Sequence, residues 1–161
     1  MATHFHGERA SGHRALRRGR TSIPGQTYLI TFTTYQRARL FEMSECASLV
    51  SRSLHALDIW KGTALLAWTV MPDHLHALIR LGEKETISLT VQRMKSLISA
   101  RINQQTGFSQ TCWQRGFHDH AIATNEPLFG FAQYIVNNPL RAGLIQNNGN
   151  YPYLWLHQQF L

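Results

Sequence analysis

The fold is decided by the stretch MPDHLHALIRL, residues 71–81. It is an apolar run that contains His74 and His76, and the side chains of a β-strand alternate between its two faces. As a strand, the run places both histidines on one face. Residues 64–70 form a second apolar run just before it, and a Pro-Asp pair typical of turns lies between the two. The sequence therefore predicts two antiparallel strands joined by a turn at residues 71–73.

The histidine pair has two interpretations. Two imidazoles side by side on a rigid strand can bind a divalent metal ion. Two polar residues on a half-exposed strand face would give the same pattern, and a His-x-His triplet alone does not separate the two. The residues that the rest of the chain brings to this pair therefore decide between them.

Length and charge restrict the possible functions. The chain has 161 residues, enough for one domain with a real core. It carries 16 Lys and Arg against 9 Asp and Glu, a formal net charge of +7, which favours a polyanionic partner such as nucleic acid or an acidic membrane surface. No apolar run reaches the roughly 18 residues of a membrane span, and no apolar signal core follows the charged N-terminus. Cys46 and Cys112 stand far apart, as expected for reduced thiols of a cytoplasmic protein.

The N-terminal segment, residues 1–22, is basic and has few large apolar residues, whereas residues 23–161 read as a single domain. Such a segment is typically disordered when free. It can also order on nucleic acid as a basic arm, as arms of other DNA-binding modules do. Its candidate DNA contacts are Arg14, Arg17, Arg18 and Arg20.

Seven elements follow from periodicity and from turn signals. Strands are predicted at residues 27–35, 64–70, 74–81 and 117–122, and helices at 44–57, 86–105 and from 124 or 125 to 139. Their order, β-α-β-β-α-β-α, predicts an α+β fold of the ferredoxin-like type, an antiparallel sheet with helices packed on one face. The last helix is then free to lie near the histidine pair.

A second histidine pair lies on the fourth predicted strand. His118 and His120 would also share a face, so they compete with His74 and His76 as the metal-binding pair. Nearby Trp113 and Phe117 are interpreted as core residues, with base stacking as the less favoured alternative.

The last predicted helix carries a tyrosine and an asparagine on the flank of its apolar stripe. Thr124 or Asn125 is expected to cap it. Tyr134 and Asn138 are four residues apart, so they lie one above the other. Pro139 is expected to end the helix.

Further basic residues are candidates for DNA contact. They lie in the loop after the first strand, on the second helix and after the last helix: Arg37, Arg93, Lys95, Arg101 and Arg141. For the three on the second helix, a solvated helix face is the alternative. The preference for DNA comes from the charge balance of the whole chain.

Three motifs together resemble the signatures of the REP-associated tyrosine transposases. The motifs are MPDHLH at residues 71–76, WQRGFHDH at 113–120 and YIVNNPLRAGL at 134–144, and they appear in the order of that family. These proteins are related to single-tyrosine insertion-sequence transposases within the His-hydrophobic-His endonuclease class. The resemblance spans residues 23–155.

The resemblance implies a metal-dependent endonuclease and strand transferase that acts on single-stranded, palindromic repeat DNA. It implies that His74 and His76 bind the metal and that Tyr134 is the nucleophile. Asn138, or its neighbour Asn137, stands where relatives place a third ligand. Independently of the resemblance, His118 and His120 are candidates for support of the active site, because His120 could lie close enough to assist.

The implied chemistry is coherent. A divalent cation polarises a scissile phosphate, and a tyrosine hydroxyl can form a covalent phosphotyrosine that preserves the bond energy. Hard phosphate oxygens favour Mg²⁺ or Mn²⁺. No phosphate-cradling Gly-rich motif is present, so no nucleotide cofactor is expected.

Two other functions remain open: a non-catalytic protein that binds DNA hairpins, and a rolling-circle initiator or relaxase with the same chemistry. Chain length argues against the second, because it leaves no room for a helicase or another domain. We expect a cytoplasmic, nucleoid-associated bacterial protein with no membrane partner. The small size and the short link before the last helix favour a monomer.

Overall fold

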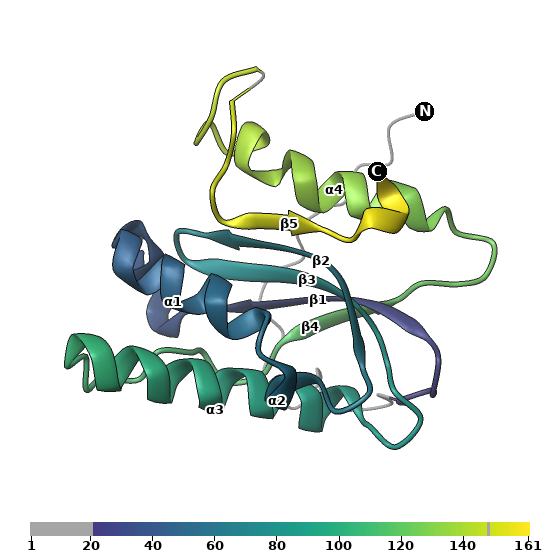
Figure 1. Cartoon of the computed structure of the whole chain (residues 1–161), viewed down its shortest axis with the longest axis horizontal. Helices are drawn as coiled ribbons and strands as arrows, with labels where there is room; N and C mark the ends of the chain where they lie inside the picture. The colour runs from purple at the N-terminus through teal and green to yellow at the C-terminus, as the bar shows by residue number, and fades with distance from the viewer. Residues whose placement is uncertain (1–20, 148) are drawn as a thin grey trace.

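The protein is built on a five-stranded antiparallel sheet in a computed structural model that describes residues 21–147 and 149–161 (Figure 1). The strands are β1 (Thr27–Thr33), β2 (Ala64–Met71), β3 (His74–Arg80), β4 (His118–Ala121) and β5 (Leu154–Leu156). The helices are α1 (Ser44–Leu54), α2 (Leu57–Trp60), α3 (Ile87–Thr106) and α4 (Leu128–Arg141), with 3₁₀ segments at Tyr35–Arg37, Leu40–Glu42 and Gln158–Phe160. None of these helices is long and apolar enough to cross a membrane.

The strand order β4-β1-β3-β2-β5 confirms the predicted ferredoxin-like fold. The hairpin predicted around residues 71–73 is present, since β2 ends at Met71 and β3 begins at His74. β3 lies at the centre of the sheet, between β1 and β2. A residue on β3 is therefore held by hydrogen-bonded neighbours on both sides, which makes this strand a rigid platform.

The two faces of the sheet carry different helices (Figure 1). One face of β3 presents Leu75, Ala77 and Ile79 to the main core, which α1 and α3 complete. The opposite face presents Leu78 to a smaller core that α4 closes. By alternation, His74 and His76 lie on the same face as Leu78. The histidine pair therefore faces α4.

Strand register brings the second histidine pair to that same face. Thr31 of β1 pairs with His76 of β3 on one side and with His118 of β4 on the other. Leu29 of β1 likewise pairs with His120. All four histidines therefore lie on the α4 side of the sheet, with β1 between the two pairs.

Two element ends differ from the prediction by two or more residues in the first half of the chain. β1 ends at Thr33 instead of residue 35, because the chain turns into a 3₁₀ segment with positive φ at Gln36 and Arg37. The first helix ends at Leu54 instead of residue 57. The buried indole of Trp60 donates a hydrogen bond of 2.7 Å to the Leu54 carbonyl, which fixes this helix end beside α2.

The predicted bounds of the last helix are wrong at both ends. α4 begins at Leu128 with Pro127 as its N-cap, so neither Thr124 nor Asn125 caps it. It also continues past Pro139 to Arg141. The backbone N–H groups of Ala142 and Leu144 donate to the carbonyls of Asn138 and Pro139, which closes the turn after the proline.

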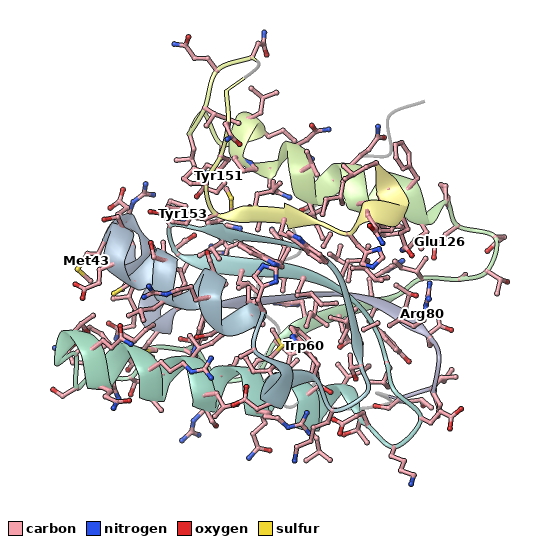
Figure 2. All side chains as sticks on the ribbon, viewed as in Figure 1. Met43, Trp60, Arg80, Glu126, Tyr151 and Tyr153 are labelled. Atoms are coloured by element: carbon pink, nitrogen blue, oxygen red, sulfur yellow. The ribbon has the colours of Figure 1, made fainter. Side chains whose placement is uncertain are left out.

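Strand β5 was not predicted at all. It extends the sheet at the edge of β2, where Trp155 pairs with Trp68 (Figure 1). Tyr151 and Tyr153 precede it, as Figure 2 shows, and the hydroxyl of Tyr151 donates to the Val70 carbonyl at 2.7 Å. The strand has only three residues, so its sequence carries no alternation long enough to detect.

Candidate functional site

The site begins with the histidine pair on β3. The rings of His74 and His76 lie 4.8 Å apart and nearly perpendicular to each other, at 86°. His76 is only 6% exposed, and its Nδ1 lies 2.7 Å from the hydroxyl oxygen of Thr31. Burial, and then the neighbouring His74, lower the pKa of His76 to about 3, so its ring is neutral near pH 7. A neutral imidazole is the form that binds a metal ion.

His74 is held by a carboxylate on the hairpin turn. Its Nδ1 lies 2.6 Å from an oxygen of Asp73, whose other oxygen accepts a hydrogen bond of 3.0 Å from Arg37. Burial alone would raise the pKa of Asp73, but the hydrogen bonds from His74 and Arg37 outweigh it and hold the pKa below its ordinary value. Asp73 is therefore an ionised acceptor that orients the imidazole.

Both histidines thus use Nδ1 for a partner within the protein. These partners lie on β1 and on the turn, and each leaves the Nε2 atom of its histidine for a ligand. A ring whose other nitrogen is bound by a hydroxyl or carboxylate has its tautomer and its orientation fixed, as is usual for metal-binding histidines.

α4 brings Tyr134 to this pair. The helix packs Ala132 and Ile135 on the sheet, against Leu66 and Leu78. Tyr134, on the flank of that apolar stripe, is half-buried with its ring centroid 5.6 Å from that of His76. The predicted proximity of the last helix to the histidines is therefore present.

Asn138 lies one turn after Tyr134, and its side-chain amide donates a hydrogen bond of 2.8 Å to the Tyr134 carbonyl. This contact uses the nitrogen and leaves the amide oxygen as an acceptor or ligand. Asn137, by contrast, is exposed. Arg141 lies one further turn along, with its guanidinium carbon 5.6 Å from the centre of the Tyr134 ring.

The donor set is short of a third acidic or histidine ligand. Within residues 21–147 and 149–161, no group of three or more His, Cys, Asp or Glu side chains is arranged to hold a metal ion. The first histidine pair and α4 offer two imidazole nitrogens, of His74 and His76, and the amide oxygen of Asn138. These groups fit a cation that keeps most of its charge, since all three donors are neutral.

A cleft of about 650 Å³ opens beside Tyr134, between β1, β4 and the beginning of α4. His118, His120 and Glu126 line it together with Phe131 and Tyr134. The second histidine pair is therefore next to the tyrosine rather than next to the first pair. In β-sheet geometry, two strand spacings of about 4.8 Å separate β4 from β3.

Glu126 is a residue that the sequence did not single out for the site. It lies on the loop between β4 and α4 (Figure 2), and its carboxylate accepts hydrogen bonds from Nε2 of His120 at 3.1 and 3.2 Å. The backbone N–H of Ala123 also donates to it at 2.7 Å and holds its pKa below the ordinary value, with a smaller contribution from His120. The signal in the sequence that could have identified Glu126 is its position six residues after His120, across a turn.

The basic residues proposed for DNA contact fall into three groups. Arg37 and Arg141 flank the site, because Arg37 forms an ion pair with Asp73 and Arg141 lies over the ring of Tyr134. The α3 residues lie on the helix of the opposite sheet face, bonded within the fold: Arg93 to Glu85 at 2.8 Å, Lys95 to the Gln114 carbonyl at 2.8 Å, and Arg101 to Asp58 at 3.4 Å. Arg14, Arg17, Arg18 and Arg20 lie outside the described residues.

Comparison with solved structures shows a shared fold. A structure of a REP-associated tyrosine transposase bound to a REP hairpin superposes with a TM-score of 0.66 at 22% sequence identity, covering 84% of this chain and 79% of that one.

Curated relatives point the same way. A putative REP-associated tyrosine transposase of Haemophilus influenzae is 25% identical over 103 residues, which cover 58% of this chain and 58% of that protein. The REP-associated tyrosine transposase of Escherichia coli is 26% identical over 92 residues, 57% of this chain and 53% of that protein. The chain thus matches a little over half the length of each relative.

The family model of the IS200-like transposases matches residues 22–138. That range holds both histidine pairs, Tyr134 and Asn138, and it is well over half of the chain. The resemblance to the REP-associated tyrosine transposases seen in the sequence is confirmed by these matches, and the chain belongs to the IS200-like transposase family of enzymes.

Proposed function

We propose that the chain is a metal-dependent endonuclease and strand transferase that acts on single-stranded DNA hairpins of palindromic repeats through a 5′-phosphotyrosine on Tyr134. The observation that carries the proposal is the 5.6 Å contact between the rings of Tyr134 and His76. A nucleophile placed beside two oriented imidazoles is an arrangement suited to displacement at a phosphate.

His74, His76 and Asn138 would hold the metal ion, Mg²⁺ or Mn²⁺. A bound divalent ion would polarise the scissile phosphate and reduce its negative charge. The protein contributes the orientation: Thr31 and Asp73 fix the two imidazoles, and the Tyr134 carbonyl fixes the Asn138 amide. The exposed Asn137 has no such support, so Asn138 is the proposed ligand.

Tyr134 would attack the phosphorus directly. Its phenolic oxygen forms the new bond, the DNA is left attached through its 5′-phosphate, and the other fragment ends in a 3′-hydroxyl. The phosphotyrosine keeps the energy of the broken bond, so a second 3′-hydroxyl can take over the 5′-phosphate without a nucleotide cofactor. Cleavage and strand transfer are then the same step in two directions.

Hairpin DNA is the proposed substrate because a structure with this fold was solved with a REP hairpin. Arg37 and Arg141 flank the site and are the proposed phosphate contacts within the described residues. We assign Arg93, Lys95 and Arg101 to the fold, because their polar groups are bonded on the far side of the sheet. The arginines of residues 1–22 are proposed as an arm that binds DNA.

A single copy of the chain would suffice for this chemistry. Tyr134 lies beside His76 and His76 beside His74 within one chain, and Asn138 lies one helical turn after Tyr134. No second copy has to supply a residue, which supports a monomer as the acting form.

The test is a nicking assay on labelled hairpin oligonucleotides with palindromic stems and single-stranded flanks. We expect cleavage with Mn²⁺ or Mg²⁺, none with a chelator, and a covalent protein–DNA adduct on a denaturing gel. H74A and H76A should lose cleavage, whereas H55A, a histidine at the end of α1 on the other sheet face, should match the wild type. Hairpin binding without cleavage in any metal would make the chain a non-catalytic hairpin-binding protein.

A further inference from the structure

We propose that His120 donates a proton to the 3′-oxygen that leaves during cleavage, and that Glu126 is the positioning residue for this histidine. The proposal rests on the proposed function, because it adds a role within the same cleft. It concerns the leaving 3′-oxygen, to which neither the proposed metal-binding pair nor the tyrosine donates a proton.

The geometry of His120 is that of an oriented acid–base group. Nε2 donates to both carboxylate oxygens of Glu126, at 3.1 and 3.2 Å. The ring is also stacked on Phe131, with centroids 5.3 Å apart and an angle of 23°. A carboxylate on one nitrogen and an aromatic ring on one face hold the imidazole in place. A base oriented by a third group is the general pattern of acid–base sites.

Glu126 is itself fixed. The Ala123 N–H donates to one of its oxygens at 2.7 Å, so the carboxylate cannot rotate away from His120 without losing a backbone contact. The other nitrogen of His120, Nδ1, has no hydrogen-bond partner in the part of the chain that the structure describes. The His120 side chain is 45% exposed, so this nitrogen can exchange protons with substrate and water.

His120 and the proposed nucleophile line one cleft. Tyr134 and His120 line the same cleft, with Phe131 of α4 between them in sequence and stacked on the His120 ring. In an in-line displacement the attacking and leaving oxygens lie on opposite sides of phosphorus. In this proposal the phosphate lies in the cleft between Tyr134 and His120, so that its leaving oxygen faces the imidazole.

Other titratable groups of the cleft serve this role less well. His74 and His76 each use Nδ1 within the protein and are assigned to the metal through Nε2. His118, two residues before His120 on β4, has no carboxylate partner among the described residues.

The proposed step forms one bond to phosphorus and breaks another. The Tyr134 oxygen bonds to phosphorus while the bond from phosphorus to the 3′-oxygen breaks. The proton of the His120 imidazolium moves to that 3′-oxygen and gives a 3′-hydroxyl, and the phenolic proton of Tyr134 passes to water. In strand transfer, neutral His120 takes the proton from an attacking 3′-hydroxyl as Tyr134 leaves.

A sulfur substitution in the DNA tests this role. In a hairpin whose scissile 3′-oxygen is replaced by sulfur, the leaving group is a thiolate. A thiol has a pKa of about 8.5, so a thiolate leaves without receiving a proton. The position of the scissile bond is first mapped with the wild-type protein and the ordinary hairpin. If no covalent adduct forms in that reaction, the proposed function is refuted rather than the role of His120.

We expect H120A to cleave the ordinary hairpin about 10²–10⁴-fold more slowly than the wild type, the usual range for acid–base catalysis. On the sulfur hairpin it should come within about tenfold of the wild type. E126Q should show a smaller loss with the same rescue, whereas Y134F should fail on both substrates and H55A should match the wild type on both.

Two outcomes would overturn the proposal: wild-type rates for H120A on the ordinary hairpin, or an equal loss for H120A on both hairpins. Wild-type rates for E126Q would overturn the role of Glu126. Melting temperature and hairpin affinity of each variant are measured alongside. H120Q, which preserves side-chain bulk, is used if H120A does not fold, and the same two outcomes decide.

Discussion

Thr31 and His76 are paired across β1 and β3, and the threonine hydroxyl lies 2.7 Å from Nδ1 of the buried imidazole. The pair links the centre of the sheet to the proposed nucleophile, because the ring centroid of His76 lies 5.6 Å from that of Tyr134. Metal binding by His76 would therefore depend on Thr31, an uncharged residue of the neighbouring strand.

Thr31→Val keeps the shape of the side chain and removes the hydroxyl. We expect Mn²⁺ affinity to fall about 10–100-fold, the usual effect of removing a group that orients a metal-binding histidine. The measurement is calorimetric titration of Mn²⁺. Thr33→Val on the same strand is the matched control, and equal affinities of the two variants would contradict the role of Thr31.

Asn138→Ala and Asn137→Ala separate the two asparagines of α4. Asn138 has its amide nitrogen on the Tyr134 carbonyl and its oxygen available, whereas Asn137 is exposed. We expect the first variant to lose metal affinity and cleavage, and the second to retain both. Calorimetry and the nicking assay give the readouts. A larger loss in Asn137→Ala would reverse the assignment.

Lys95 gives a test of stability against pH. Burial lowers its pKa from 10.5 to about 8. Between these values the unfolded chain binds more protons than the folded chain, so this group makes the free energy of unfolding rise with pH. Relative to Lys95→Met, the wild type should gain about 1–2 kcal/mol over this window, a figure reduced for partial exposure. Denaturant titrations at both ends of the window measure it; parallel behaviour of the two proteins would contradict the shift.

Removal of residues 1–20 tests the arm, which lies outside the described residues. Each arginine that neutralises a phosphate contributes a salt slope of about −0.7 on single strands. We expect the salt slope of hairpin binding to be flatter in the truncated protein, by the contribution of two to four such contacts. Titrations at several salt concentrations, on a cognate and a scrambled hairpin, give the slopes. Unchanged slopes on both hairpins would assign DNA binding to Arg37 and Arg141 instead.

Much of the fold could be predicted because it follows from local patterns. The alternation in β3 placed His74 and His76 on one face, and the apolar stripe of α4 predicted a helix whose flank carries Tyr134. The order of elements then predicted the ferredoxin-like fold. These patterns repeat over several residues, so a single exception does not hide them.

The parts that could not be predicted depend on contacts between distant segments. β5 has three residues and exists through its pairing with β2. α4 tolerates Pro139 because later N–H groups close the turn. Glu126 lies just before α4, and the turn from Ala123 directs its carboxylate to His120. In each case the deciding partner lies outside the local pattern.

Tyr134, beside His76, is the proposed nucleophile. The most direct measurement is mass spectrometry of the peptide that carries covalently bound DNA after reaction of the wild-type protein with a hairpin and Mn²⁺. We predict the adduct on Tyr134, and no adduct in Tyr134→Phe although that variant still binds the hairpin. An adduct on Tyr28, Tyr35, Tyr151 or Tyr153, or cleavage by Tyr134→Phe, would contradict the account.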